Sequence, residues 1–139
     1  MGILTVRVVS RSFASTSGGA PTVALQATDL DVAENDFITI LGPSGCGKST
    51  LLRIVAGLDQ QTSGTVLLEG NNITGAGADR GMVFQSYTLF PWLNVLDNVC
   101  FGLRERGLAR PEQLDIAQGF IQKVGLKGFE NHFPKQLSG

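Results

Sequence analysis

The N-terminal part of the chain alternates short apolar runs with connections rich in glycine and small polar residues, a pattern typical of β-strands. Residues 3–9 (ILTVRVV) predict one strand, and a second is predicted to begin near Val23. Residues 37–41 (FITIL) form a nearly continuous apolar run before a glycine, which predicts a strand covered on both faces of a parallel sheet. TVLLE and RGMVFQ, each bounded by turn residues, predict two further strands.

Three segments have helical periodicity instead. KSTLLRIVAGL carries a broad apolar stripe and predicts a helix that ends near Gly57. Asn94 is a suitable cap for a helix through VLDNVCFGL, because its side chain can accept a hydrogen bond from the first turn. Pro111 is preorganised for the first turn of a last helix, which Gly125 would end. The apolar face of this helix is expected to contain Leu114, Ala117, Ile121 and Val124.

The change from strand to helix periodicity divides the chain. We expect residues 1–85 to form an α/β part and residues 86–139 a helical part. No internal repeat is apparent in either part.

Composition narrows the class of protein. Eleven Lys and Arg against twelve Asp and Glu leave a net charge of −1, which gives no basic surface for nucleic acid. No apolar run approaches the roughly 18 residues that span a bilayer. The two cysteines, Cys46 and Cys100, lack metal-ligand spacing and fit a reducing cytosol, so we expect both to be small buried hydrophobes.

The strongest chemical signal is GPSGCGKST. It supplies G-x-x-x-x-G-K-[ST] at Gly42, Gly47, Lys48 and Ser49. A loop of small residues can turn its N–H groups inward around an anion, and the following helix adds the positive end of its dipole. Lys48 would reach the β- and γ-phosphates, and the Ser49 hydroxyl would ligate Mg²⁺.

The alternative is a glycine-rich turn that only joins a strand to a helix. The motif follows a predicted buried strand and opens an amphipathic helix, which is the context that a phosphate loop requires. We therefore expect a nucleoside triphosphate. The loop alone cannot distinguish a kinase, a GTPase, a helicase and a transport ATPase.

Three stretches in order resemble the ATP-binding cassette (ABC) ATPases over essentially the whole chain. They are LGPSGCGKSTLLRIVAGLDQQTSGTVLLEG, the Q-loop-like RGMVFQ, and KQLSG, which is similar to the first part of an LSGGQ signature. GADRGMVFQSYTLFPWLNVLDNVCFGL resembles the ATPases of bacterial nitrate, sulfonate and taurine importers. The resemblance implies a P-loop NTPase core with a partial parallel sheet and antiparallel strands, followed by a helical subdomain. VFQ and QLSG also argue against a small-molecule kinase.

The resemblance also implies a set of site residues. Lys48 and Gln85 would act in catalysis, and Ser49 and Gln85 would hold Mg²⁺. Phe13 would stack on adenine, although it could instead be an ordinary core residue, and Gln85 without the motif order would be an exposed polar residue. The ATP-binding set as a whole comprises Phe13, Gly42, Pro43, Ser44, Gly45, Cys46, Gly47, Lys48, Ser49, Thr50, Ser138 and Gly139.

Protein partners follow from the same resemblance. ABC ATPases work as head-to-tail dimers, in which Ser138 and Gly139 would contact the partner's nucleotide. Phe90, Trp92 and Leu93 would face a transmembrane permease at the inner face of the cell membrane, or would instead be buried in the helical subdomain. The lone His132 has no ligand or catalytic partners at a useful spacing, so we expect an ordinary histidine.

The chain stops at QLSG, inside the signature-like stretch. Family members continue with the Walker B aspartate, a glutamate that polarises water, and a switch histidine. We therefore expect these residues to be the N-terminal portion of a longer ATPase and to have negligible turnover alone. The alternative is a non-hydrolysing nucleotide-binding or assembly fragment.

Overall fold

The computed structural model describes residues 2–15, 18–86 and 88–137. Its contacts divide the chain into two compact units, residues 1–83 and residues 84–139. In the part of the chain that the structure describes, no helix has the length and apolar character needed to cross a bilayer.

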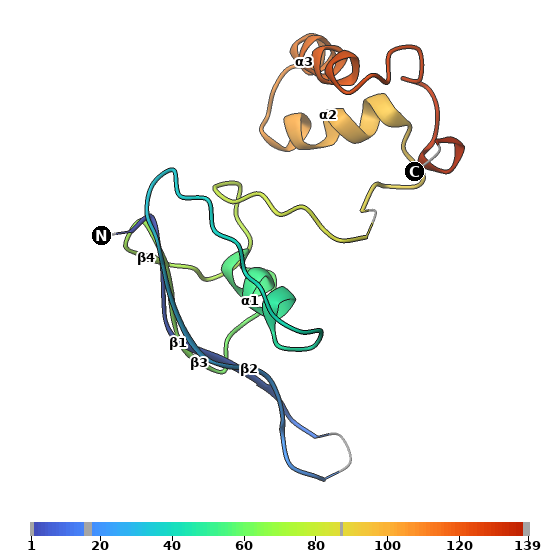
Figure 1. Ribbon diagram of the computed structural model, residues 1–139. Helices are drawn as coiled ribbons and strands as arrows, with labels where there is room; N and C mark the ends of the chain where they lie inside the picture. Colours follow the sequence, from blue (N-terminus) through green and yellow to red (C-terminus); the bar gives the residue numbers. More distant parts are fainter. Residues whose placement is uncertain (1, 16–17, 87, 138–139) are drawn as a thin grey trace. The chain divides into compact units, whose positions relative to one another are not determined.

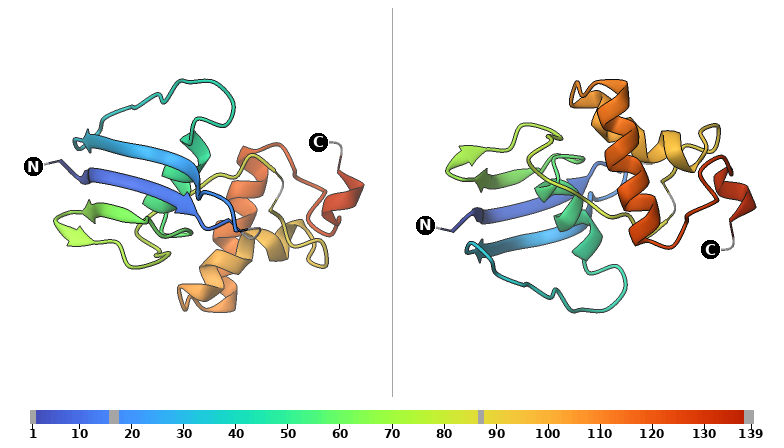
Figure 2. Two further views of the ribbon diagram at one scale, coloured as in Figure 1. Left: turned by 90° about the horizontal axis from the view of Figure 1, so that it is seen from below. Right: turned by 90° about the horizontal axis from the view of Figure 1, so that it is seen from above.

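The first unit is built on a four-stranded sheet (Figure 1). Its strands are β1 (Leu4–Phe13), β2 (Thr22–Val32), β3 (Ser63–Leu68) and β4 (Asn71–Asn72). They lie in the order β2-β1-β3-β4, and every pair of neighbours is antiparallel. Figure 2 shows the strands side by side in this order, with the helix α1 against one face.

A break in the register of β1 explains which of its residues are buried. Val6 and Val9 are both fully buried, although an unbroken strand would place residues three apart on opposite faces. The pairing with β2 shifts between them, and Val8 has a positive φ of 49°. Because such a bulge inserts an extra residue, Val9 returns to the face that Val6 occupies. Val8 is correspondingly exposed.

The helix α1 (Lys48–Val55) closes the core of this unit. Leu51 and Ile54, three positions apart and therefore on one face, are its buried residues. They belong to a cluster with residues of β1, β2 and β3, whose buried members are Val6, Val9, Leu25, Leu51, Ile54 and Val66. The predicted helix is thus present, and it begins at the predicted lysine.

Two of the predicted strands are not strands in this structure. Residues 37–41 and 80–85 have no strand assignment, and the described residues contain no parallel pair. A strand exists only where a neighbouring backbone accepts and donates its hydrogen bonds, and the described sheet offers neither segment such a neighbour. Several of their apolar side chains are exposed, Phe37 by 93% and Val83 by 98%, whereas Ile40 packs against the core cluster.

The second unit is helical. It contains α2 (Val95–Glu105), α3 (Arg110–Lys123) and a short 3-10 helix, η1 (Pro134–Gln136). Asn94 caps α2 as predicted, with its side-chain oxygen accepting from the Asp97 amide at 2.7 Å. The buried apolar residues of the pair are Val95 and Cys100 on α2, and Ala117 and Ile121 on α3.

The buried face of α3 differs from the predicted one because it includes a polar residue. Gln113 is buried, whereas Val124, expected on the apolar face, is exposed. The Gln113 side chain donates to the Leu108 carbonyl at 2.7 Å, which satisfies part of its hydrogen bonding. A satisfied amide can be buried where an unsatisfied one could not.

Candidate functional site

The loop of residues 42–47 enters α1 through backbone conformations that favour glycine. Gly45 and Gly47 have φ values of 80° and 100°. A Cβ atom added at Gly47 would lie 2.7 Å from the Ala24 carbonyl oxygen and 2.9 Å from a Leu25 methyl group of β2. Only a residue without a side chain can therefore bring the loop this close to β2.

Lys48 folds back into this loop. Its ammonium donates to the carbonyls of Gly42 and Pro43, both at 2.8 Å, and lies 3.6 Å from the Cys46 sulfur. Among the ion pairs of the described residues, none involves Lys48. The loop thus surrounds a positive charge that is not paired with a carboxylate of the described residues.

The N-terminus of α1 is arranged for an anion. Gly47 is the cap residue, no side chain caps the helix, and the first turn contains no acidic residue. The first N–H groups of a helix have no intrahelical acceptor, and the helix dipole favours negative charge there. Ser49, in this first turn, is exposed. These N–H groups and the Lys48 ammonium are donors that suit an anion, and the role of the Ser49 hydroxyl as a Mg²⁺ ligand stays a prediction.

The two cysteines have different environments. Cys100 is buried as expected, and its burial raises the pKa of its thiol. The same prediction is wrong for Cys46, which is exposed. Cys46 lies in the phosphate loop, where its sulfur is beside the Lys48 ammonium and is not part of the buried cluster of this unit.

Phe13 ends β1 and is not part of the buried core, since its side chain is 45% exposed. The guanidinium carbon of Arg11 lies 4.5 Å from the centre of its ring. Arg11 pairs in register with Leu25, and Leu25 is a residue that the phosphate loop approaches at Gly47. Phe13 therefore belongs to the end of the sheet that adjoins the loop.

The remaining residues of the predicted ATP site belong to the second unit. Gln85 is exposed there, so that its joint role with Ser49 in holding Mg²⁺ stays a prediction. Ser138 and Gly139 lie outside the described residues. Within the described ranges no group of three or more His, Cys, Asp or Glu could hold a metal ion.

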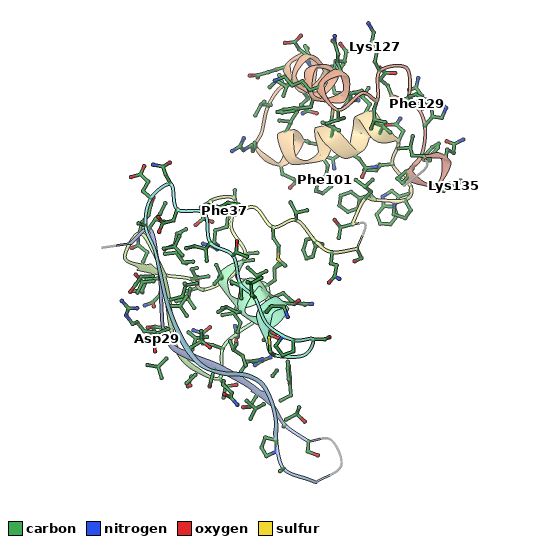
Figure 3. The ribbon with its side chains drawn as sticks, viewed as in Figure 1. Asp29, Phe37, Phe101, Lys127, Phe129 and Lys135 are labelled. Atoms are coloured by element: carbon green, nitrogen blue, oxygen red, sulfur yellow. The ribbon has the colours of Figure 1, made fainter. Side chains whose placement is uncertain are left out.

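The aromatic segment of the second unit is partly exposed and locally ordered. The Phe90 ring is 5.5 Å from that of Trp92 and 4.4 Å from that of Phe101 on α2, which is labelled in Figure 3. Trp92 is 70% exposed, whereas Leu93 is half-buried. Of Phe90, Trp92 and Leu93, which were predicted to face a partner, Trp92 is therefore the most exposed.

Asn98, which the sequence reasoning missed, holds this segment in place. Its amide oxygen accepts from the Phe90 amide at 2.9 Å, and its nitrogen donates to the carbonyls of Phe90, Leu93 and Asn94 at 3.1, 2.9 and 3.0 Å. A signal was available: Asn98 is a polar residue among the apolar positions of its helix, one turn after the cap Asn94.

His132 has a structural role. Its carbonyl accepts from the Val95 amide at 2.9 Å, which ties the segment before η1 to the start of α2. Its ring packs against Phe129 with 5.0 Å between the ring centres, and its buried Nδ1 has no hydrogen-bond partner among the described residues.

Curated relatives match most of the chain. It is 59% identical over 116 residues to an uncharacterised ABC transporter ATP-binding protein of Methanocaldococcus jannaschii, covering 84% of this chain and 43% of the relative. It is 45% identical over 136 residues to a nitrate import ATP-binding protein of Synechocystis, covering 98% and 50%. It is also 45% identical over 139 residues to a taurine import ATP-binding protein of Burkholderia thailandensis, covering 100% and 53%. The chain spans about half the length of these relatives.

Solved structures show the same fold. The ATP-binding cassette MJ0796, in a dimeric post-hydrolysis state bound to ADP and Pi, superposes with a TM-score of 0.84 at 30% identity. The match covers 97% of this chain and 63% of that one. The predicted α/β cassette fold is therefore confirmed.

A family model described as "ABC transporter" matches residues 25–139, which include the phosphate loop, α1 and the helical unit. This match agrees with the loop geometry around Lys48 and with the names of the relatives. The chain belongs to the ABC transporter family, as one of its ATP-binding proteins.

Proposed function

We propose that this chain binds Mg·ATP through residues 42–50 and supplies that step in an ABC importer. The observation that carries the proposal is the phosphate loop itself. Its glycines curl the backbone around the Lys48 ammonium, and the uncapped N-terminus of α1 opens beside it. Backbone amides, one ammonium and one hydroxyl suffice to hold a triphosphate with its magnesium.

Equilibrium binding of Mg·ATP to the 139-residue chain tests this proposal. Lys48→Ala removes the charge from the loop and should weaken binding by about a hundredfold, because charge-assisted contacts to phosphate contribute about 1.5–3 kcal/mol each. Lys127→Ala is the matched control, since Lys127 is an exposed lysine of the other unit, beyond α3 (Figure 3).

We expect Lys127→Ala to bind as the unchanged chain does. Isothermal titration calorimetry gives the affinities, and circular dichroism checks that each variant folds. Saturable binding that is equal in all three proteins would show that the loop does not hold the nucleotide. The absence of saturable binding to the unchanged chain would overturn the proposal itself.

We propose further that the 139-residue chain by itself turns over ATP negligibly. Residues 42–50 contain no acid and no histidine that could orient water, and the single histidine, His132, belongs to the other unit. The measurement is release of inorganic phosphate from Mg·ATP. Phosphate release by the unchanged chain that is lost in Lys48→Ala would contradict the proposal of negligible turnover. It would not contradict the proposal that the chain binds Mg·ATP.

The proposed setting is a bacterial importer of a small anion of the nitrate, sulfonate or taurine type. The names of the relatives support the substrate class, since they are nitrate and taurine import proteins. We place the chain at the cytoplasmic face of the membrane, joined to a permease through the exposed Trp92 and its neighbours Phe90 and Leu93. A second ATPase subunit would complete a head-to-tail dimer.

A second candidate function is a non-hydrolysing assembly module. The exposed apolar side chains of Phe37, Leu41 and Val83 favour it, because such surface supports association with another polypeptide. Sedimentation velocity without ATP distinguishes the two candidate functions. An assembly module should associate under these conditions, whereas Mg·ATP binding does not require the chain to associate.

A further inference from the structure

One side chain connects the end of β1 to the end of α1. An Arg11 guanidinium nitrogen lies 2.8 Å from the Asp59 carboxylate, and both side chains are largely buried. The Asp59 amide donates to the Arg53 carbonyl of α1 at 3.3 Å, and the Asp59 carboxylate accepts from the Gln60 amide at 2.8 Å. Asp59 is therefore held to the last turn of α1, and Arg11 is held to Asp59.

Neighbouring hydrogen bonds fix the same junction. The Thr62 amide donates to the Ser10 carbonyl at 2.8 Å, and the Thr62 hydroxyl accepts from the Ser12 amide at 2.9 Å. The residues on either side of Arg11 are thus bonded to the segment that follows Asp59. This limits the movement of the Arg11 backbone.

The Arg11 guanidinium also covers the Phe13 ring. Its carbon lies 4.5 Å from the ring centre, so the two side chains are in contact. A guanidinium is planar and stacks on aromatic rings, which an ammonium cannot do in the same way. Phe13 keeps 45% of its surface exposed, so part of the ring stays available beyond the arginine.

The ring also has a defined place relative to the phosphate loop. Arg11 pairs with Leu25, and a Leu25 methyl group would be 2.9 Å from a Cβ atom at Gly47. Gly47 starts α1, and Asp59 follows its end. The backbone of Arg11 is therefore linked, through its partner Leu25, to Gly47 at the N-terminus of α1. The Arg11 side chain binds Asp59, which lies beyond the C-terminus of the same helix.

We propose that Arg11 is a positioning residue for base recognition. Fixed by Asp59, its guanidinium holds the Phe13 ring so that the free face of the ring receives the purine base of the triphosphate bound at Lys48. This inference rests on the proposed function. It adds a residue that contacts neither the phosphates nor the base.

The test compares two ligands that share the triphosphate and differ in the adenosine, which is present in Mg·ATP and absent from inorganic triphosphate with Mg²⁺. Phe13→Ala should weaken ATP binding about tenfold, because stacking on an aromatic ring is worth that much or more. Arg11→Ala should weaken it about fivefold. Neither variant should change the affinity for triphosphate by more than about twofold.

Two further variants control for charge and folding. Arg7→Ala removes another arginine of the same strand, which pairs at 2.8 Å with Asp31 and lies in the exposed part of β1. It should leave both affinities unchanged. Arg11→Lys keeps a cation for Asp59 but loses the planar stack, so it should weaken ATP binding about threefold without affecting triphosphate.

The outcomes separate this inference from the proposed function. If the unchanged chain binds neither ligand, both are overturned. The inference fails if the unchanged chain binds triphosphate and ATP equally. It also fails if Arg11→Ala binds ATP as tightly as the unchanged chain or more tightly. In both cases the proposal that the phosphate loop binds the nucleotide is unaffected. An equal loss for ATP and triphosphate in Arg11→Ala and Arg11→Lys would mean a general structural role, and this too overturns the inference.

Discussion

At the scale of single residues, the candidate site depends on what competes for Lys48. Its ammonium donates to two neutral carbonyls of its own loop. A phosphate oxygen carries a negative charge, so its hydrogen bond with the ammonium joins two opposite charges, whereas a carbonyl oxygen offers only a dipole. The loop carbonyls therefore orient the lysine without preventing its ammonium from binding a phosphate instead. The absence of a carboxylate from the loop sequence favours the same exchange.

The two cysteines provide a prediction at this scale. Iodoacetamide should modify Cys46 at least tenfold faster than Cys100 at neutral pH, because Cys46 is exposed and Cys100 is buried. Burial raises the pKa of Cys100, so its thiolate is scarcer at a given pH and its reaction should accelerate only at higher pH than that of an ordinary thiol. Peptide mass spectrometry measures both rates.

Mg·ATP should slow the modification of Cys46, which lies 3.6 Å from the Lys48 ammonium, without affecting Cys100. Cys46→Ser provides the background rate for Cys100 alone. Equal rates at the two thiols in the native chain would contradict the burial of Cys100.

At the scale of elements, the connection before α2 is ordered by one amide. Asn98 makes four hydrogen bonds to the backbone of residues 90–94, which lack regular secondary structure for most of their length. The Phe90 ring is meanwhile packed on Phe101. A segment so held can present an exposed Trp92 at a low entropic cost, because its backbone is already fixed.

Trp92 gives the corresponding prediction, since it is the single tryptophan of the chain. Its fluorescence should be strongly quenched by acrylamide, and binding of the cognate permease in detergent should shift the emission to the blue. Trp92→Ala should weaken permease binding by about 2 kcal/mol, as truncation of an exposed aromatic anchor does.

Phe120→Ala is the matched control, because Phe120 is an exposed aromatic residue on α3. It should leave permease binding unchanged. Asn98→Ala should weaken binding and also destabilise the fold by about 1–3 kcal/mol, because it leaves backbone groups unpaired. Permease binding that is unaffected by Trp92→Ala would refute the proposed docking residue.

At the scale of the whole molecule, two units carry separate cores, and the first one leaves apolar segments uncovered. Residues 37–41 and 80–85 have the composition of buried strands, yet Phe37 and Val83 are almost fully exposed. Their exposure follows from the lack of a paired neighbour in the described sheet. Such surface favours association with other polypeptides.

Two valines test this contrast with identical chemistry. Val66→Ala, in the buried cluster of the first unit, should reduce the free energy of unfolding by about 2 kcal/mol. Val83→Ala should change it by less than about 0.5 kcal/mol. Urea denaturation measures both. Phe37→Ser should lower the fluorescence of bound anilinonaphthalene sulfonate without loss of stability. A large destabilisation by Val83→Ala would show that this segment is covered.

Local features of the chain were predictable from the sequence because they depend on residues close together along it. The phosphate loop, the start of α1 at Lys48, the Asn94 cap and the helix that begins next to Pro111 each require only short-range sterics and hydrogen bonds. The order of motifs also sufficed to identify the ABC family, which the comparisons confirm.

Only the tertiary structure decided the features that depend on distant residues. Apolar composition made residues 37–41 a candidate strand, but pairing requires another backbone beside them, and the described sheet has none. The bulge at Val8 and the contact of Arg11 with both Asp59 and Phe13 likewise depend on how separate segments pack. Sequence periodicity indicates which side chains are suited to burial, whereas the packing of distant segments determines which of them are buried and against what.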